Sequence, residues 1–357
     1  MFPNLSDMNK SLRFGLIGCG SFGVHLGEYL LEVGQIACVC DVDRQRASDT
    51  AKQLGLEVPV FTDYAALVAE CELDAVAITA ANFVHCEIAC AAARAGLHVY
   101  CEKAMASNLE QCWQMVNAAQ QHNVKLMVGH KRRLRTSWSR MVELTGDDLL
   151  GEPLAMSVTQ YADMRPYEYP EQWWSDPKLS GGPFALLGVH VLDWFRAMCG
   201  DVQCVSAQFG PKMEPGYKFP DIVHAMYRFR SGALATINTS FMYPLHKFRE
   251  AQGSMVQCRQ GGFKLVPQME TIDLYWQRLD ENATHHEQFP VVDDFPPAYR
   301  REIGDFAAWV LEDRKPCLTW EEGLRCVEMM EAAYRSAENG GQRVDFPLMD
   351  ELSDHPA

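Results

Sequence analysis

FGLIGCGSFG, at residues 14–23, decides the fold of this chain. An apolar run typical of a β-strand leads into a Gly-x-Gly-x-x-Gly turn, and the turn opens a segment with helical periodicity. In a nucleotide-binding turn the first glycine allows a tight bend, the second lets a pyrophosphate approach the backbone, and the third permits close helix–strand packing. Amides at the helix start would then hold the phosphate. The residues predicted to contact a dinucleotide here are Gly18, Gly20, Ser21, Phe22 and Gly23.

The same pattern continues up to residue 130. Short apolar runs alternate with helical segments, which is the signature of βαβ units. Because βαβ crossovers are right-handed, the pattern predicts a doubly wound parallel sheet. We expect residues 1–130 to form an NAD(P)-binding Rossmann domain. The predicted strands are 13–17, 36–40, 75–79, 98–101 and 125–128, and the predicted helices are 24–32, 44–54, 64–69, 86–95 and 109–122.

The pattern changes after Arg133. Strand-like segments now follow one another through short turns, which predicts a large open, mostly antiparallel sheet in an α+β domain over residues 131–357. The lateral face of such a sheet could serve oligomerisation, as a homodimer or homotetramer. Residues 268–298, rich in acids and proline, are expected to be irregular. The predicted strands are 154–161, 202–210, 223–230, 233–241 and 253–258, and the predicted helices are 184–198, 299–312 and 321–338.

Composition restricts the class of partner. The chain has 357 residues, of which 48% are hydrophobic and 22% charged, as expected for a soluble protein of two domains. Its formal net charge of −15 argues against nucleic-acid and anionic-membrane partners, because both need a basic face. Residues 1–10 are polar, unlike a signal peptide, and no apolar run of about 18 residues could span a membrane.

Thirteen cysteines are scattered through the sequence, many of them in apolar segments. Their odd number and the lack of CxxC spacing fit buried thiols in a reducing cytoplasm better than a disulfide framework. No zinc-type spacing occurs, so no metal site is predicted, and His285 and His286 are interpreted as solvated histidines.

Asp41 follows the second predicted strand, 21 residues after Gly20. Its carboxylate could accept hydrogen bonds from an adenosine ribose, which favours NAD over NADP. Arg44 and Arg46 keep NADP open, because an arginine can pair with a 2′-phosphate. The alternatives are a purely structural turn for the glycines and a helix-capping role for Asp41.

Glu102 and Lys103 close the predicted strand 98–101. Open parallel sheets bind ligands at the carboxyl ends of their strands, so Lys103 lies where a ligand is expected. An ammonium group there can donate to a hydroxyl or carbonyl oxygen and stabilise the charge that develops as a hydride moves. The alternative is an exposed lysine at a strand end. Asn82, after the strand 75–79, is a candidate contact for ribose or nicotinamide, or a turn residue.

Four stretches of the chain together resemble the Gfo/Idh/MocA family of sugar and polyol oxidoreductases. They are GCGSFG at 18–23, AGLHVYCEKA at 95–104, VGHKRR at 128–133 and GGPFALLGVHVLD at 181–193. The resemblance implies a Rossmann domain followed by an α/β domain with a large open sheet. It also implies reversible hydride transfer between NAD(P) and a sugar or cyclitol carbon.

The resemblance assigns roles to the lysine and to a histidine. Glu102 and Lys103 match the family's Glu-Lys-Pro motif, with Ala104 in place of the proline. The match implies that Lys103 contacts both the reacting oxygen and the nicotinamide ribose, and it places Glu102 in the cofactor site. His190 matches the family's general base, a task that suits an imidazole with an ordinary pKa of about 6.5.

Near His190 the sequence also departs from the family. Asp193 matches an acid often found there and is a candidate for proton relay or for orienting its neighbours. Leu186 stands where the family usually has an aspartate that helps to move the proton. Asp193, Asp163 and Tyr161 are the candidates to replace it; the alternative is a reaction other than the standard oxidation.

Substrate contacts are predicted in the aromatic-rich segment before the second motif. The candidates are Tyr161, Arg165, Trp173 and Trp174. Aromatic rings can stack on sugar C–H faces and arginine binds hydroxyls or anions, but packing between subunits or domains explains the aromatics equally well. Arg132 and Arg133 are interpreted as inter-domain salt-bridge formers.

Three functions follow from these residues. The first is an NAD(P)-dependent dehydrogenase or reductase acting on a sugar, cyclitol or related polyol. The second is a glycoside hydrolase of the same family that oxidises its substrate transiently and consumes no NAD. The third is a non-catalytic regulator that binds a dinucleotide, which would need neither Lys103 nor His190.

Overall fold

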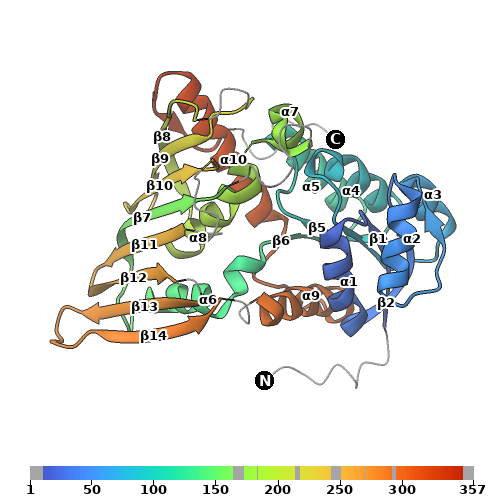
Figure 1. Cartoon of the computed structure of the whole chain (residues 1–357), viewed down its shortest axis with the longest axis horizontal. Coiled ribbons are helices and arrows are strands. Elements are labelled where there is room, and N and C mark those ends of the chain that lie inside the picture. The colour runs from blue at the N-terminus through green and yellow to red at the C-terminus, as the bar shows by residue number, and fades with distance from the viewer. Residues whose placement is uncertain are drawn as a thin grey trace. The chain divides into compact units, whose positions relative to one another are not determined.

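The computed structural model describes residues 11–163, 173–182, 184–213, 218–242, 251–268, 270–291 and 295–348 (Figure 1). The chain divides into two compact units. The first contains the described residues up to His130 together with Tyr299–Leu324, and the second contains the described residues between Lys131 and Ala298 and those from Arg325 onward. Among the described residues, no helix is both long and apolar enough to span a membrane.

The first unit is built on a six-stranded, all-parallel sheet with the strand order β3-β2-β1-β4-β5-β6. Its strands are fully buried apolar runs at the centre, as in β4, which is the composition that a parallel sheet covered by helices requires. The fold predicted from the glycine-rich turn is confirmed. The strands are β1 (Leu12–Ile17), β2 (Gly34–Cys40), β3 (Val60–Phe61), β4 (Ala75–Ile78), β5 (His98–Glu102) and β6 (Leu126–Gly129).

Several helices of the first unit begin at side-chain caps that the sequence supplies. The carboxylate of Asp43 accepts from two amides at the start of α2, and the side chain of Asn108 accepts from the Gln111 amide at the start of α5. Such caps satisfy amides that the first helical turn leaves without partners. The helices are α1 (Ser21–Val33), α2 (Arg44–Gln53), α3 (Tyr64–Glu70), the short η2 (Asn82–Val84), α4 (His85–Arg94), α5 (Leu109–Gln121) and α9 (Phe295–Glu312).

The second unit is built on a nine-stranded sheet with the order β14-β13-β12-β11-β7-β10-β9-β8-β15. Only β7 and β10 pair in parallel, so the sheet is mostly antiparallel, as predicted. The strands are β7 (Pro153–Tyr161), β8 (Val202–Phe209), β9 (Ile222–Phe229), β10 (Leu234–Ser240), β11 (Ala251–Cys258), β12 (Gly261–Pro267), β13 (Thr271–Arg278), β14 (His285–Pro290) and β15 (Val344–Asp345).

One face of this sheet carries helices α8 (Val189–Cys199) and α10 (Trp320–Glu338) (Figure 1). Tyr227 of β9 packs its ring edge-on against Phe195 of α8 and donates from its hydroxyl to the Met329 carbonyl of α10. On the opposite face alternate residues are exposed, including Met226 and Met255. The unit also contains η3 (Lys131–Leu134), α6 (Thr136–Leu144), η4 (Trp173–Ser175), α7 (Pro177–Ser180) and the π-helical turn η5 (Phe184–Gly188).

The prediction of irregular structure over residues 268–298 is wrong. The segment contains the β13–β14 hairpin, in which the ring of His285 stacks on Trp276 and that of His286 stacks on Tyr275. His286 also pairs with the Asp273 carboxylate at 2.8 Å. Because β14 is a polar edge strand, its sequence lacks the apolar alternation by which strands are recognised.

Candidate functional site

The glycine-rich turn has the geometry that a pyrophosphate site needs. Gly18 has a φ of +99°, and a Cβ atom there would lie 2.3 Å from the Ala80 backbone nitrogen. A Cβ on Gly23 would lie 2.1 Å from the Gly18 carbonyl oxygen, so this position permits the close approach of α1 to the turn. Gly20 is different, because nothing lies within 4 Å of its Cβ position. The turn therefore leaves open space beside the first amides of α1, where an anion can bind.

Asp41 lies directly after β2 and is buried. Its Oδ2 accepts from the Cys19 amide at 2.8 Å, and its Oδ1 accepts from the Asp43 amide at 3.0 Å and from Arg46 Nη1 at 3.4 Å. Asp43, and not Asp41, caps α2. The carboxylate predicted to read the ribose thus also holds the middle of the glycine-rich turn.

Buried side chains hold Glu102 at the end of β5. The Tyr100 hydroxyl lies 3.1 Å from Glu102 Oε1 and 2.7 Å from Glu302 Oε2 of α9, and all three residues are buried. Burial, followed by the two carboxylates, raises the pKa of the Tyr100 phenol well above its usual value, so the hydroxyl keeps its proton. On the neighbouring strand Gly129 leaves the room that this arrangement needs, because a Cβ there would lie 2.4 Å from the Tyr100 oxygen.

The turn that contains Lys103 is fixed by hydrogen bonds of a buried histidine, His85. The Lys103–Ala104 peptide bond is cis. The ring of His85 lies between two carbonyl oxygens, with Nδ1 3.0 Å from that of Ala104 and Nε2 2.9 Å from that of Ala80. Burial lowers the pKa of His85, so the neutral ring donates to one of these oxygens at a time. This side chain ties the Lys103 turn to the loop after β4.

Asn82 and Phe22 complete the predicted cofactor residues of this unit. Asn82 begins η2 at the carboxyl end of β4 and is 4% exposed. The ring of Phe22 packs against those of His25 and Tyr299, with centroids 6.3 Å and 6.0 Å away. Phe22 is therefore a packing residue between α1 and α9, which is a role that its position in the motif does not predict.

In the second unit, His190 is the second residue of α8 and is 4% exposed. The preceding turn, η5, is π-helical, so the chain widens where the sequence predicts a regular helix from residue 184. Leu186 lies in this turn and packs, together with Trp173, against the apolar cluster of Trp174, Phe219 and Met242. The residue at the family's aspartate position is thus a packing residue here.

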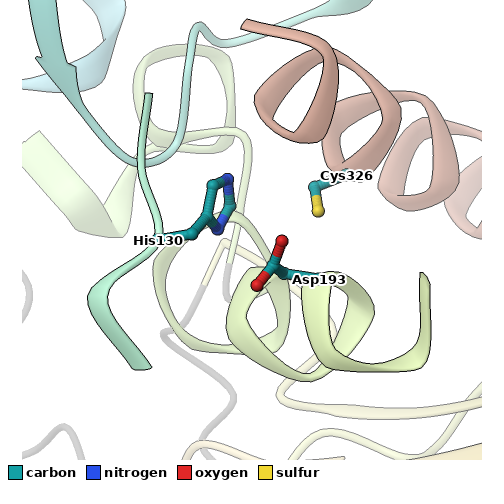
Figure 2. A group of neighbouring side chains, drawn as sticks. All are labelled: His130, Asp193 and Cys326. Carbon is teal, nitrogen blue, oxygen red and sulfur yellow. The ribbon is translucent and has the colours of Figure 1, made fainter. Parts of the chain in front are cut away.

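Asp193 is held by a buried ion pair. Arg133 donates from Nε to Asp193 Oδ2 at 3.0 Å, and its Nη2 pairs with Oδ1 and donates to the Asp193 carbonyl at 3.3 Å. Both residues belong to the second unit, so this pair is not the inter-domain salt bridge that the sequence suggested for Arg133. Figure 2 shows the Asp193 side chain on α8 and the Cys326 side chain on α10. The Cys326 sulfur lies within 4.8 Å of an Asp193 carboxylate oxygen. The bidentate contact with Arg133 leaves the Asp193 carboxylate suited to orienting its surroundings.

The predicted substrate contacts are only partly described. Tyr161 ends β7 and is half-buried, and Asp163 forms an isolated bridge with Met242. Trp174 belongs to the apolar cluster, so core packing accounts for it. Arg165 lies outside the described residues.

Both halves of the chain match descriptions of a single family. Residues 12–130 match the oxidoreductase family's NAD-binding Rossmann fold, and residues 143–346 match its C-terminal α/β domain. The chain belongs to the Gfo/Idh/MocA family. It is an oxidoreductase with an NAD-binding Rossmann domain, and the expectation from the sequence motifs is confirmed.

Members of this family with named activities align along nearly the whole chain. A D-xylose 1-dehydrogenase (NADP+) of Haloferax volcanii is 27% identical over 92% of this chain and 98% of its own length. An inositol 2-dehydrogenase/D-chiro-inositol 3-dehydrogenase of Lactiplantibacillus plantarum is 26% identical over 94% of each chain. An Agrobacterium radiobacter oxidoreductase, solved with NAD+, L-tartaric acid and magnesium, shares the fold with a TM-score of 0.84 at 22% identity, over 94% of this chain and 98% of that one.

Two residues around Lys103, Tyr100 and Glu302, were missed as parts of the site, and the role of a third, His85, was not predicted. Tyr100 lies two residues before Glu102 on the same side of β5, so strand periodicity could have found it. Glu302 is 202 residues from Tyr100 and no local pattern connects them. His85 is recognisable in the sequence only as a residue after β4, and its contact with the Ala104 carbonyl requires the fold.

Proposed function

We propose that this protein transfers a hydride between nicotinamide and a hydroxyl-bearing carbon of a sugar, cyclitol or related polyol. The observation that carries the proposal is the anchored turn after β5, where Lys103 follows the buried Glu102 in an NAD-binding domain. The relatives named for xylose and inositol act on polyhydroxylated substrates, which supports this substrate class. NAD is the favoured cofactor because of Asp41, and Arg46 beside it keeps NADP as the alternative.

In this proposal the catalytic residues are Lys103 and His190. Lys103 donates a hydrogen bond to the reacting oxygen and stabilises the negative charge that develops on it. His190 accepts the hydroxyl proton as a general base, so the O–H bond breaks as the carbonyl forms. Bound NAD supplies the acceptor for the hydride.

Neighbouring residues support these two side chains. We assign Asp193 an orienting role through its ion pair with Arg133. Because Leu186 packs in an apolar cluster, the proton taken up by His190 must leave through solvent or through a group other than residue 186. Tyr161, Arg165, Trp173 and Trp174 are proposed to lie near the substrate. The proposed cofactor contacts are Gly18, Gly20, Ser21, Phe22, Gly23, Asp41, Asn82, Glu102 and Lys103.

The test is a substrate panel. The purified protein is incubated with sugars, inositols and aryl glycosides, each with NAD, with NADP and without added cofactor. Net formation of reduced nicotinamide with a sugar or inositol supports the proposal. Cleavage of an aryl glycoside without net reduction would replace it with the hydrolase. Dinucleotide binding with no turnover of any compound would replace it with a regulator.

We also propose that the protein works as a homo-oligomer through the open face of the nine-stranded sheet. A hollow of about 450 Å³ lies on strands β7, β11, β12 and β13. Its lining includes Met255, Phe263 and Tyr275 and contains neither aspartate nor glutamate, although the whole chain carries a net charge of −15. A mostly apolar hollow with no acidic residue in its lining can meet its own copy without the repulsion between acidic groups that the rest of the surface would cause.

Substitution of Met255, which is 65% exposed, tests this face. Met255→Lys should lower the molar mass measured by light scattering, whereas Leu279→Lys, at a residue 79% exposed and outside the hollow, should not. An unchanged mass for Met255→Lys would exclude this face as the interface.

The thirteen free thiols lead us to propose that the protein resides in the cytoplasm.

A further inference from the structure

A second pocket in the sheet-bearing unit collects three arginines. Its volume is about 380 Å³. Arg196 comes from the last turn of α8, Arg230 from the turn after β9, and Arg325 from α10. We propose that this pocket binds a small oxyanion, namely a phosphate or carboxylate group of a metabolite. The inference goes beyond the proposed hydride transfer, which assigns no role to these residues.

Main-chain and side-chain contacts assemble the pocket from separate elements. The Arg230 amide donates to the Asp201 carbonyl at 2.8 Å, which fixes the end of β9 beside the start of β8. Arg196 Nη2 donates to Asp201 Oδ1 at 3.0 Å, which joins the end of α8 to the same point. Asp201 therefore holds Arg196 through its carboxylate and Arg230 through its main-chain carbonyl, which brings the two arginines together.

Donors remain available after these contacts are made. Arg196 Nε is buried and has no hydrogen-bond partner among the residues that the structure describes, and the Arg196 side chain is only 11% exposed. Arg230 is exposed, and among the described residues its guanidinium makes a single long hydrogen bond, 3.4 Å to the Phe346 carbonyl. A buried donor without an acceptor costs about 1–3 kcal/mol, so an acceptor entering the pocket is favoured.

The carboxylates of the pocket are already engaged. Glu328 accepts from Arg325 Nη1 at 2.9 Å and from the Leu348 amide at 2.8 Å. Asp201 is paired with Arg196. Asp201 and Glu328 are thus paired with Arg196 and Arg325, whereas Arg230 has no carboxylate partner among the described residues, in a chain whose net charge is −15. The uncompensated charge of Arg230 favours an anion over a neutral sugar.

The chemistry of the donors restricts the class of ligand that the pocket can bind. Guanidinium groups present parallel N–H donors that match the oxygens of a carboxylate or a phosphate. Arg196 lies six residues after His190 on α8, about 9 Å along the helix axis at the usual rise per residue. An anion held at Arg196 would therefore contact the same helix that carries the proposed base.

The test measures anion binding to the NAD-saturated protein, so that the dinucleotide turn is filled. Inorganic phosphate and succinate are titrated at constant ionic strength, set with sodium chloride, and the thermal unfolding midpoint and calorimetric binding are followed. We expect saturable binding of at least one anion. Binding of phosphate alone identifies a phosphate site, and binding of succinate alone identifies a carboxylate site.

Variants locate the binding. Arg230→Gln, at an exposed position that tolerates substitution, should weaken the affinity about tenfold, as expected for loss of a charged hydrogen bond. Arg196→Lys keeps the charge but removes the Nε donor and should also weaken binding. Arg228→Gln, two residues earlier on β9 and outside the pocket, should bind as the unmodified protein does. The proposal is overturned if neither anion raises the midpoint above the chloride control, or if Arg230→Gln and Arg196→Lys bind unchanged.

Discussion

The two proposed catalytic residues are held in different ways. The Lys103 turn is fixed by hydrogen bonds from uncharged donors, from His85 to the Ala104 carbonyl and from Tyr100 to Glu102. The helix that carries His190 is fixed by an ion pair between Asp193 and Arg133 and is preceded by a π-helical turn. The difference indicates that the first region depends on packing room around a strand end, and the second on a buried charge remaining compensated.

The largest expected effect is on catalysis. Lys103→Ala should reduce kcat/KM about 10³-fold, because it removes the donor that stabilises charge on the reacting oxygen. NAD binding, followed by calorimetry, should remain measurable, since the glycine-rich turn and Asp41 are untouched. Full activity in this variant would show that the anchored turn serves the fold alone.

The ion pair around α8 should be the next most sensitive feature. Arg133→Met leaves the buried carboxylate of Asp193 without its partner and should lower the free energy of unfolding by about 3 kcal/mol, measured by urea denaturation. Arg133→Met/Asp193→Leu, which removes both charges, should recover much of that loss. As a matched surface control, Arg259→Met breaks the exposed pair with Glu152 and should cost less than about 1 kcal/mol. Equal losses in the two single variants would contradict the comparison.

Packing room around β5 can be tested with two glycines of the first unit. Gly129→Ala places a Cβ 2.4 Å from the Tyr100 oxygen and 3.2 Å from Glu102 Oε1, and should cost about 2 kcal/mol. Gly304→Ala, on α9 with nothing within 4 Å, should instead stabilise the protein by about 0.5–1 kcal/mol. Thermal unfolding of both variants checks the opposite signs, and a harmless Gly129→Ala would mean that Tyr100 can move without cost.

The smallest expected effect is a dependence of stability on pH. Burial lowers the pKa of His85 below the ordinary 6.5, so just below that pH the unfolded chain binds more protons than the folded one. The free energy of unfolding should therefore fall as the pH decreases from about 6.5 toward the lowered value. His85→Gln should show a shallower fall between about pH 7 and about pH 5.5 in denaturant titrations. Equal slopes of the free energy of unfolding against pH in the two proteins would show that His85 does not contribute to the loss of stability in acid.

The contrast between local patterns and long-range contacts explains which features the sequence could predict. The glycine-rich turn, Asp41 and the position of Lys103 follow from patterns within about 20 residues, and these patterns carry the fold. Arg133 and Asp193 are 60 residues apart, and Tyr100 and Glu302 are 202 apart, so their contacts exist only in the folded chain. The β13–β14 hairpin was missed because ring stacking and an Asp273–His286 pair, not apolar alternation, accompany its pairing.

Asp41 has a consequence for how cofactor preference can change. The carboxylate predicted to read the ribose also accepts from the Cys19 amide in the middle of the glycine-rich turn. A substitution of Asp41 that admits a 2′-phosphate would also release the turn that we propose binds the pyrophosphate. A route from NAD to NADP, by engineering or by natural variation, is therefore less damaging if it begins at Arg46, whose half-exposed side chain already lies 3.4 Å from that carboxylate.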